Sequence, residues 1–152
     1  MSIVPRQLAN TPAPLSFYDL EIMARTIYGE ARGEKWAGKV AVAWVIRNRA
    51  EADLGRDNRP DWWGEGIAGV CLRPWQFSCW NAKDKMRPKI EAADSLKLAD
   101  CIRVAFAVLT DEEPDPTKGA THYYASYIPE PKWAQGRTPT TVIGLHKFYR
   151  IV

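Results

Sequence analysis

The sequence predicts a mainly α-helical protein of the α+β class, with a helical body and a few short strands in its C-terminal third. Two observations predict this fold class. Apolar residues recur at helical spacing in several segments before Asp111, and beyond it turn-forming residues separate short extended stretches. A length of 152 residues favours one folded domain with one core, which we assign to residues 16–152. Residues 1–15 contain three prolines and are predicted to form an extended arm.

The first two helices are predicted on either side of a turn bracketed by glycines. The first begins after Ser16, a favourable N-cap, and its apolar positions recur every three or four residues as far as Gly29. Glu30 then falls on the last turn of this helix or just beyond it, before Gly33. The second helix is expected from about Lys35 to Ala50, and because it is apolar on most sides it should be central.

The middle of the chain is predicted to alternate loops and helices. Residues 51–64 are rich in Asp, Gly and Pro and predict a loop, and residues 66–72 predict a short helix that stops before Pro74. Residues 75–81 are aromatic without a clean period, which favours a loop. Apolar spacing then predicts one long helix from about Ile90 to Thr110.

Short extended pieces are expected near the C-terminus, after a turn at residues 115–119. Residues 122–124, 141–143 and 147–149 have the composition of strands. Gly144 lies between the last two and predicts a tight turn.

The composition is typical of a globular protein and limits the partners. The net charge of +3 suits an anionic partner such as a bacterial wall or a nucleic acid. No run of Lys and Arg with interleaved aromatics is present, so no nucleic-acid partner is predicted. Seven Trp and six Tyr indicate either flat surfaces that stack on sugars or bases, or a core rich in tryptophan.

The three cysteines do not form a recognisable zinc or disulfide framework, so reduced thiols are expected and neither a metal nor a cofactor is predicted. A bridge between Cys71 and Cys79 is the alternative that their spacing leaves open. No run is long and apolar enough to span a membrane, and the N-terminus lacks the apolar core of a signal peptide. We therefore expect synthesis in a cytoplasm, no stable membrane insertion, and release by another agent if the protein acts outside.

Glu30 is the first candidate catalytic residue. A carboxyl group at a helix end beside Tyr28 can be partly desolvated, and such a group stays protonated near neutral pH and acts as a general acid. Glu34 lies four residues on. Cleavage of a glycoside also needs a group that stabilises or captures the positively charged sugar, so Glu34 is the second candidate. The alternative is that both are solvated surface glutamates.

Two aromatic segments are candidates for binding. Gln76 lies among Phe77 and Trp80, and an amide surrounded by rings fits a carbohydrate subsite; the alternative is a loop that fills the core. His122 could be a base or a ligand, although a single histidine beside tyrosines is more often a hydrogen-bonded structural group. The cysteines and histidines lack metal-ligand spacing, which disfavours a metal site.

Five blocks in the same order resemble the SleB/CwlJ-type cell wall hydrolases, a family of spore-cortex-lytic and phage lytic enzymes. They are ARTIYGEARGE (24–34), GKVAVAWVIRNR (38–49), QFSCW (76–80), ATHYY (120–124) and IGLHKFY (143–149). The resemblance covers roughly residues 20–150. It implies a compact lysozyme-like fold that cuts the glycan strands of peptidoglycan, and it assigns the family's catalytic acid to Glu30.

The implied reaction is cleavage between N-acetylmuramic acid and N-acetylglucosamine. Glu30 would donate a proton to the glycosidic oxygen and then act as a base. Attack by the muramic acid 6-hydroxyl defines a lytic transglycosylase, for which one carboxylate suffices, and attack by water defines a muramidase, which normally needs a second one. The sequence shows no convincing second carboxylate apart from Glu34. This lack favours the transglycosylase. The expected groove residues are Tyr28, Asn48, Gln76, Phe77, Trp80, His122, Tyr123 and Tyr124, although Asn48 could instead bridge buried backbone.

Two other functional classes stay open. A non-catalytic wall-binding module would need the aromatic residues but not Glu30, and a metal-dependent amidase or peptidase would lose activity with a chelator. The chain leaves no room for a separate wall-binding module, which favours a small phage endolysin. Such an enzyme would act as a monomer on glycan strands after a holin opens the membrane.

Overall fold

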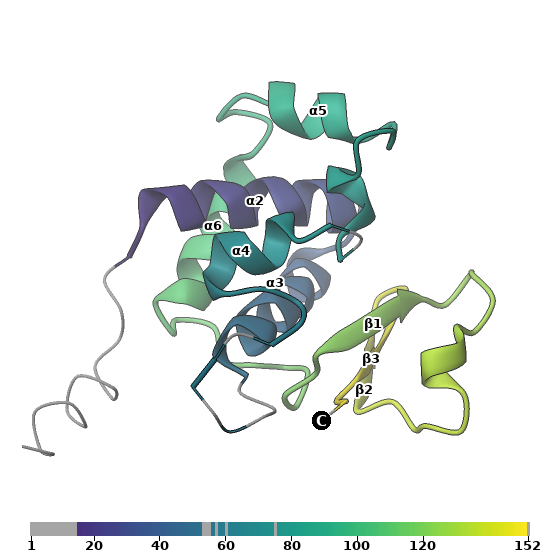
Figure 1. Cartoon of the computed structure of the whole chain (residues 1–152). Helices are drawn as coiled ribbons and strands as arrows, with labels where there is room; N and C mark the ends of the chain where they lie inside the picture. Colours follow the sequence, from purple (N-terminus) through teal and green to yellow (C-terminus); the bar gives the residue numbers. More distant parts are fainter. Residues whose placement is uncertain (1–14, 53–55, 57, 60, 75, 152) are drawn as a thin grey trace, which may run out of the picture.

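The computed structural model describes residues 15–52, 56, 58–59, 61–74 and 76–151, so all but the last residue of the predicted arm lies outside it. Figure 1 shows a body of helices beside a small sheet, which confirms the predicted fold class. The helices are α2 (Phe17–Ala31), α3 (Trp36–Glu51), α4 (Gly66–Leu72), α5 (Arg87–Ala92) and α6 (Ala99–Leu109), with the 3₁₀ turns η1 (Ser78–Trp80) and η2 (Lys132–Ala134).

Helix α2 is capped and buried as the sequence predicts. The hydroxyl of Ser16 accepts a hydrogen bond from the backbone N–H of Asp19 (3.2 Å), which satisfies one of the free donors of the first turn. The helix contacts α3, α4, α5 and α6, and Met23 and Ile27 on its inner face are fully buried. Glu30 lies in its last turn, as predicted.

Helix α3 is the central element, in agreement with its apolar composition. Every residue from Gly38 to Ile46 is buried, so no side of this stretch faces solvent. The helix contacts α2, α4 and α6 on the helical side and β1 and β2 on the other, so it lies between the two halves of the protein.

The single long helix predicted from Ile90 to Thr110 is wrong, because α5 and α6 are separate helices. The side chain of Asp94 accepts a hydrogen bond from the backbone N–H of Lys97 (3.0 Å), a local bond that competes with helix continuation. Arg25 of α2 also donates to the carbonyls of Ile90 (2.5 Å) and Ala93 (2.9 Å). Carbonyls at the end of a helix such as α5 lack a partner within that helix. The distant Arg25 thus makes the break favourable, and apolar spacing could not reveal this.

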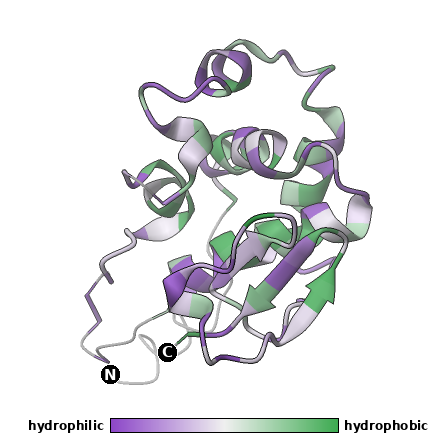
Figure 2. Cartoon of the chain, turned by 90° about the vertical axis from the view of Figure 1, so that its right-hand side faces the viewer, coloured by the Kyte–Doolittle hydropathy of each residue, from purple (hydrophilic) through white to green (hydrophobic). Residues whose placement is uncertain are grey.

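Three strands form one antiparallel sheet in the order β1-β3-β2, with β1 at His122–Ala125, β2 at Thr141–Ile143 and β3 at His146–Tyr149. The three predicted strands are therefore confirmed, with β1 one residue longer at its end and β3 one residue longer at its start. Gly144 forms the turn between β2 and β3 with a positive φ of 56°, where glycine is favoured. Figure 2 shows that both the strands and the helices carry hydrophobic (green) and hydrophilic (purple) segments.

The sheet has two buried faces. One face places Phe148 on Ala41 and Val45 of α3, with Tyr123 at the edge of this cluster. The other face carries Tyr124 and Tyr149, which pack away from the helices.

Candidate functional site

The carboxylate of Glu30 lies where the end of α2 meets η1 and β1. The residue is half-buried, and each of its oxygens accepts one hydrogen bond. Oε1 accepts from the backbone N–H of Cys79 and Oε2 from the hydroxyl of Tyr123, both at 3.3 Å. The two donors come from segments 49 and 93 residues further along the chain, so Glu30 lies at the junction of the helical body and the sheet.

Gly29 makes the contact with Cys79 possible. A Cβ atom at Gly29 would lie 2.7 Å from both Cβ and Sγ of Cys79, closer than such atoms approach in proteins. Glycine therefore lets η1 pack directly on the last turn of α2. This close approach brings the N–H of Cys79 to the Glu30 carboxylate.

Both neighbours of the carboxylate hold their protons. Burial raises the pKa of Tyr123 well above its usual value, and the negative charge of Glu30 raises it further. The same two causes raise the pKa of the Cys79 thiol. Because Tyr123 stays neutral, its hydroxyl remains a hydrogen-bond donor to Glu30 throughout the neutral range.

Arg49 is the main residue of the site to which sequence reasoning assigned no role. Its side chain is buried, with Nε donating to the carbonyl of Thr121 (2.6 Å) and Nη1 to Oε1 of Gln76 (3.2 Å). The guanidinium also lies over the rings of Phe77 (5.2 Å) and Trp63 (5.9 Å). Two hydrogen bonds and two aromatic rings thus fix the guanidinium in place.

The negative charge of Glu30 acts on Arg49. Burial lowers the pKa of Arg49, and the negative charge on Glu30 is among the effects that oppose this change. The two groups therefore lie within electrostatic reach of each other. Arg47 and Arg49 both lie near the end of α3, so the sequence alone did not single out Arg49.

Two predicted groove residues lie at the acid. Tyr123 contacts Glu30 directly, and Trp80 lies beside it along α2. The indole N–H of Trp80 donates to Oγ1 of Thr26 (2.9 Å), which is four residues before Glu30 and so on the same face of the helix. Gln76 accepts its hydrogen bond from Arg49.

Phe77 and Tyr124 require a correction. Phe77 is only 2% exposed and lies against Arg49, so its ring cannot stack on a sugar. Tyr124 is buried on the far face of the sheet, where it stacks on Tyr149 with ring centroids 5.9 Å apart. Adjacent residues of a strand face opposite sides, so Tyr124 cannot share a groove with Tyr123.

Asn48 takes the alternative role that the sequence left open. Its amide nitrogen donates to Oδ2 of Asp115 (3.0 Å) and to the carbonyl of Ala120 (2.9 Å), which ties α3 to the chain before β1. Tyr28 lies on a different side of α2 from Glu30, because positions two residues apart differ by about 200° around a helix. Its ring lies under the guanidinium of Arg32 (5.8 Å).

His122 lies in an aromatic cluster with Trp62, Trp63 and Trp133. The nearest of these rings is that of Trp133, at 5.1 Å between centroids, and Nδ1 lies 2.9 Å from the hydroxyl of Thr121. Burial first, and then the charges of nearby arginines, lowers the pKa of His122 to about 4. The ring is therefore neutral at pH 7.

Glu34 is turned toward the β2–β3 turn. Its Oε1 accepts a hydrogen bond from the backbone N–H of Leu145 (3.1 Å) and lies 2.8 Å from Nδ1 of His146, although without the alignment of a hydrogen bond. Its carboxylate also touches Gly144, where a Cβ atom would lie 2.5 Å from Oε2. The side chain is 13% exposed, so Glu34 is neither a solvated surface residue nor open to a large substrate.

The three cysteines are buried free thiols, so the Cys71–Cys79 bridge is not formed. In the part of the chain that the structure describes, no group of three or more His, Cys, Asp or Glu side chains is placed to hold a metal ion. None of the helices within the described ranges has the length and apolarity needed to cross a membrane.

Comparison with known proteins identifies the family. The sequence profile described as Cell Wall Hydrolase matches residues 33–149. A spore cortex-lytic enzyme of Halalkalibacterium halodurans is 33% identical over 140 residues, 91% of this chain, and one of Bacillus subtilis is 30% identical over 92% of it. This chain spans only 37% and 40% of the length of these two relatives.

Two solved structures have the same fold. The catalytic domain of Bacillus cereus SleB aligns with a TM-score of 0.68 and 28% identity, covering 91% of this chain and 94% of that domain. The catalytic domain of the germination-specific lytic transglycosylase SleB of Bacillus anthracis gives a TM-score of 0.67 and 28% identity over 91% of this chain and 98% of that one. The lysozyme-like fold and the family predicted from the sequence are both confirmed. The chain belongs to the cell wall hydrolase family.

Proposed function

We propose that this protein is a peptidoglycan glycosidase that cleaves the bond between N-acetylmuramic acid and N-acetylglucosamine as a lytic transglycosylase, with Glu30 as its general acid and base. The observation that carries the proposal is the position of Glu30, half-buried at the junction of the helices and the sheet and held by Tyr123 and Cys79. Membership of the cell wall hydrolase family supports it, as does the likeness to the lytic transglycosylase SleB.

The proposed reaction uses one carboxyl group twice. Protonated Glu30 gives its proton to the glycosidic oxygen, the bond from that oxygen to C1 of the muramic acid breaks, and the glucosamine unit leaves as an alcohol. The muramic acid 6-hydroxyl then forms a bond to C1 and returns its proton to Glu30, which leaves a 1,6-anhydro ring. While Glu30 is negative, the hydroxyl of Tyr123 and the N–H of Cys79 stabilise its charge.

The position of Glu34 favours this reaction over the muramidase. A muramidase needs a second carboxylate that can approach the sugar or activate a water molecule. The carboxylate of Glu34 instead contacts Leu145, His146 and Gly144. We therefore propose that Glu34 holds the β2–β3 turn and takes no part in the chemistry.

The variant Glu30→Gln tests the proposed acid. Glutamine keeps the shape but cannot donate the proton, so the rate of peptidoglycan clearance should fall by roughly a hundredfold or more. Glu21→Gln, an exposed glutamate of the same helix, is the matched control and should retain the wild-type rate. A folded Glu30→Gln protein that clears peptidoglycan at the wild-type rate would falsify the assignment.

The products distinguish the remaining alternatives. Mass spectrometry of digested peptidoglycan should find 1,6-anhydromuramic acid ends; reducing muramic acid ends would instead establish a muramidase. A wild-type protein that binds the wall and releases no fragments would be a binding module. Loss of activity on adding a chelator would indicate a metal-dependent amidase or peptidase.

The biological setting inferred from the sequence stays a prediction. It comprises a phage endolysin, made in the host cytoplasm, released through a holin and acting as a monomer. The curated relatives are named spore cortex-lytic enzymes, which is a different setting. Lysis that requires expression together with a holin would support the endolysin.

A further inference from the structure

A pocket of about 730 Å³ opens next to the proposed acid, between the end of α4 on one side and the segment from η1 to α5 on the other. Trp80 lines it, and the residue before Trp80 is the Cys79 whose N–H contacts Glu30. Thr26, which holds the indole of Trp80, precedes Glu30 by four residues, about 6 Å along the helix. Trp80 therefore connects the pocket to η1 and α2, the two segments that meet at Glu30.

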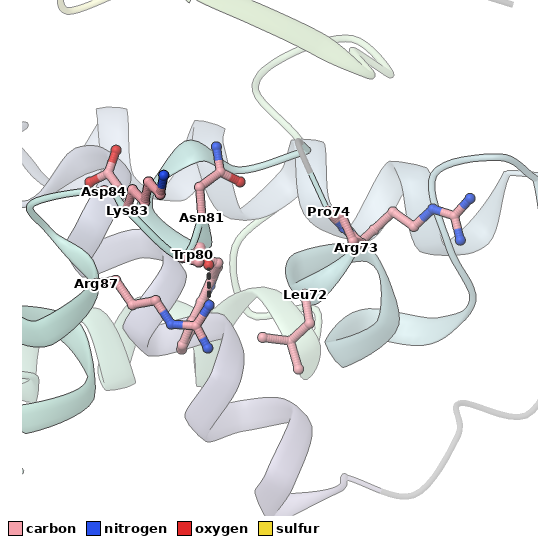
Figure 3. A pocket seen from close by; sticks show the side chains of 9 residues that line it. Leu72, Arg73, Pro74, Trp80, Asn81, Lys83, Asp84 and Arg87 are labelled. Carbon is pink, nitrogen blue, oxygen red and sulfur yellow. Dashed lines mark hydrogen bonds between the residues drawn. The ribbon is translucent and has the colours of Figure 1, made fainter.

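The pocket has an apolar floor and a cationic rim. Leu72, Pro74 and Trp80 contribute apolar surface, as Figure 3 shows, and Lys83 and Arg73 lie on opposite rims, with Arg73 extending outward. Asp84 is the one acidic residue of the lining. Its Oδ1 is already bound to the backbone N–H of Met86 (2.8 Å).

The charge of this region is concentrated. Residues 73–89 contain five cations and one anion, a net charge of +4, whereas the whole chain carries only +3. The rest of the chain is thus slightly negative. The glycan backbone itself carries no charge to match this region, whereas the peptide stems attached to muramic acid carry free carboxylates.

Two of the cations are available to a ligand. Arg87 is used within the protein, because its Nε is paired with Glu91 (2.6 Å) and its Nη1 donates to the carbonyl of Trp80 (2.7 Å), the bond drawn in Figure 3. Arg73 and Lys83 are exposed, and neither is paired with a carboxylate among the described residues. An anionic ligand could bind both without breaking an existing ion pair.

We propose that this pocket binds the carboxylate-bearing peptide stem of the muramic acid next to the scissile bond, with its apolar part against Leu72 and Trp80 and its carboxylates at Lys83 and Arg73. The proposal rests on the proposed function, since it assumes that a glycan lies at Glu30. The stem hangs from one of the two sugars at that bond. Because an extended peptide advances about 3.3–3.6 Å per residue, a stem of a few residues reaches from the acid across the pocket.

Charge reversal at the rim tests the proposal. The double variant Arg73→Glu/Lys83→Glu is compared with wild type on two substrates: peptidoglycan with intact stems, and the same glycan after an amidase has removed them. Wild type should have the higher kcat/KM on the stem-bearing substrate. The variant should lose about tenfold on that substrate and stay within about twofold on the bare glycan. Arg103→Glu, an exposed cation on α6, should change neither value.

Three results would overturn the proposal. The first is an unchanged preference for stems in the double variant. The second is an equal loss on both substrates, which would mean that the rim binds the glycan or another wall polymer. The third is the same loss in Arg103→Glu. If wild type cuts neither substrate, the proposed function itself fails. Binding of a free carboxylate-bearing stem peptide to wild type, measured by calorimetry, still tests the pocket in that case, and absence of binding would overturn it.

Discussion

The hydroxyl of Tyr123 is the side-chain group that reaches Glu30 from the sheet. Its ring is fixed by His146, with centroids 5.1 Å apart at right angles, and by Phe148 at 5.8 Å. These ring contacts do not depend on the hydroxyl. The oxygen atom of Tyr123 can therefore be removed while the packing of the ring is kept.

Replacing Tyr123 by Phe should lower kcat with little change in folding. The hydrogen bond to the carboxylate is lost, and a bond to a charged group contributes about 1.5–3 kcal/mol, so kcat should fall by roughly tenfold or more. Tyr127→Phe removes a hydroxyl from an exposed ring and is the control. A Tyr123→Phe protein with the kcat of wild type would show that the hydroxyl is not needed.

His122 should make the free energy of unfolding depend on pH. In the unfolded chain this histidine takes up a proton near its usual pKa of 6.5, and in the folded protein it does so only near pH 4. The unfolded state thus binds more protons between these values, so stability falls as the pH is lowered from about 6.5 to about 4. The free energy of unfolding, measured with urea at a series of pH values, should depend less steeply on pH in this window for His122→Gln than for wild type. Identical slopes for variant and wild type would contradict this expectation.

The packing of η1 on α2 is the contact between elements on which the site most depends. It needs a residue without a side chain at Gly29, whereas the neighbouring Gly33 has no atom within 4 Å of its would-be Cβ. The two glycines of the motif around Glu30 therefore have different duties. Only Gly29 sets the distance between the carboxylate and Cys79.

Gly29→Ala should destabilise the protein and lower its activity together. The added methyl group must displace Cys79, and overpacking of this kind costs about 1–3 kcal/mol. Gly33→Ala should change the free energy of unfolding by less than about 1 kcal/mol and leave kcat unaltered. Thermal denaturation and kcat of both variants provide the measurement. Equal effects at the two positions would mean that Gly29 is not required for close packing.

The helices and the sheet are joined by Glu34 as well as by Glu30. Glu34 follows α2 in the chain and is bound to the turn before β3, so it fixes the sheet relative to the helical body. The ammonium group of Lys39 on α3 also donates to the backbone carbonyl of Glu34. These contacts give Glu34 a structural role in the whole molecule.

Glu34→Gln should separate stability from chemistry. Glutamine can still accept from Leu145 but loses the charge beside His146, so the free energy of unfolding should fall by about 1–2 kcal/mol. The kcat of the folded variant should stay within about twofold of wild type. A loss of kcat as large as that of Glu30→Gln would instead make Glu34 a second catalytic carboxylate and the enzyme a muramidase.

Local patterns in the sequence predicted the helices, the strands and the position of Glu30 at a helix end. They could not predict what depends on contacts between distant residues. Arg25 binds the free carbonyls at the break between α5 and α6, and Asp115 accepts a hydrogen bond from Asn48. The alternation of side chains along β1 would have separated Tyr123 from Tyr124, and this signal was present in the sequence.

The thiol of Cys79 has a consequence for chemical durability. The sulfur atom lies against Gly29. Both its burial and the charge of Glu30 raise the pKa of the thiol, so it stays protonated. A thiol reacts with oxidants and alkylating reagents as its anion, so Cys79 is a poor target for either. Cys71 is also buried, and burial raises its pKa to about 12. Burial and the raised pKa thus make both thiols slow to react, although no disulfide joins them.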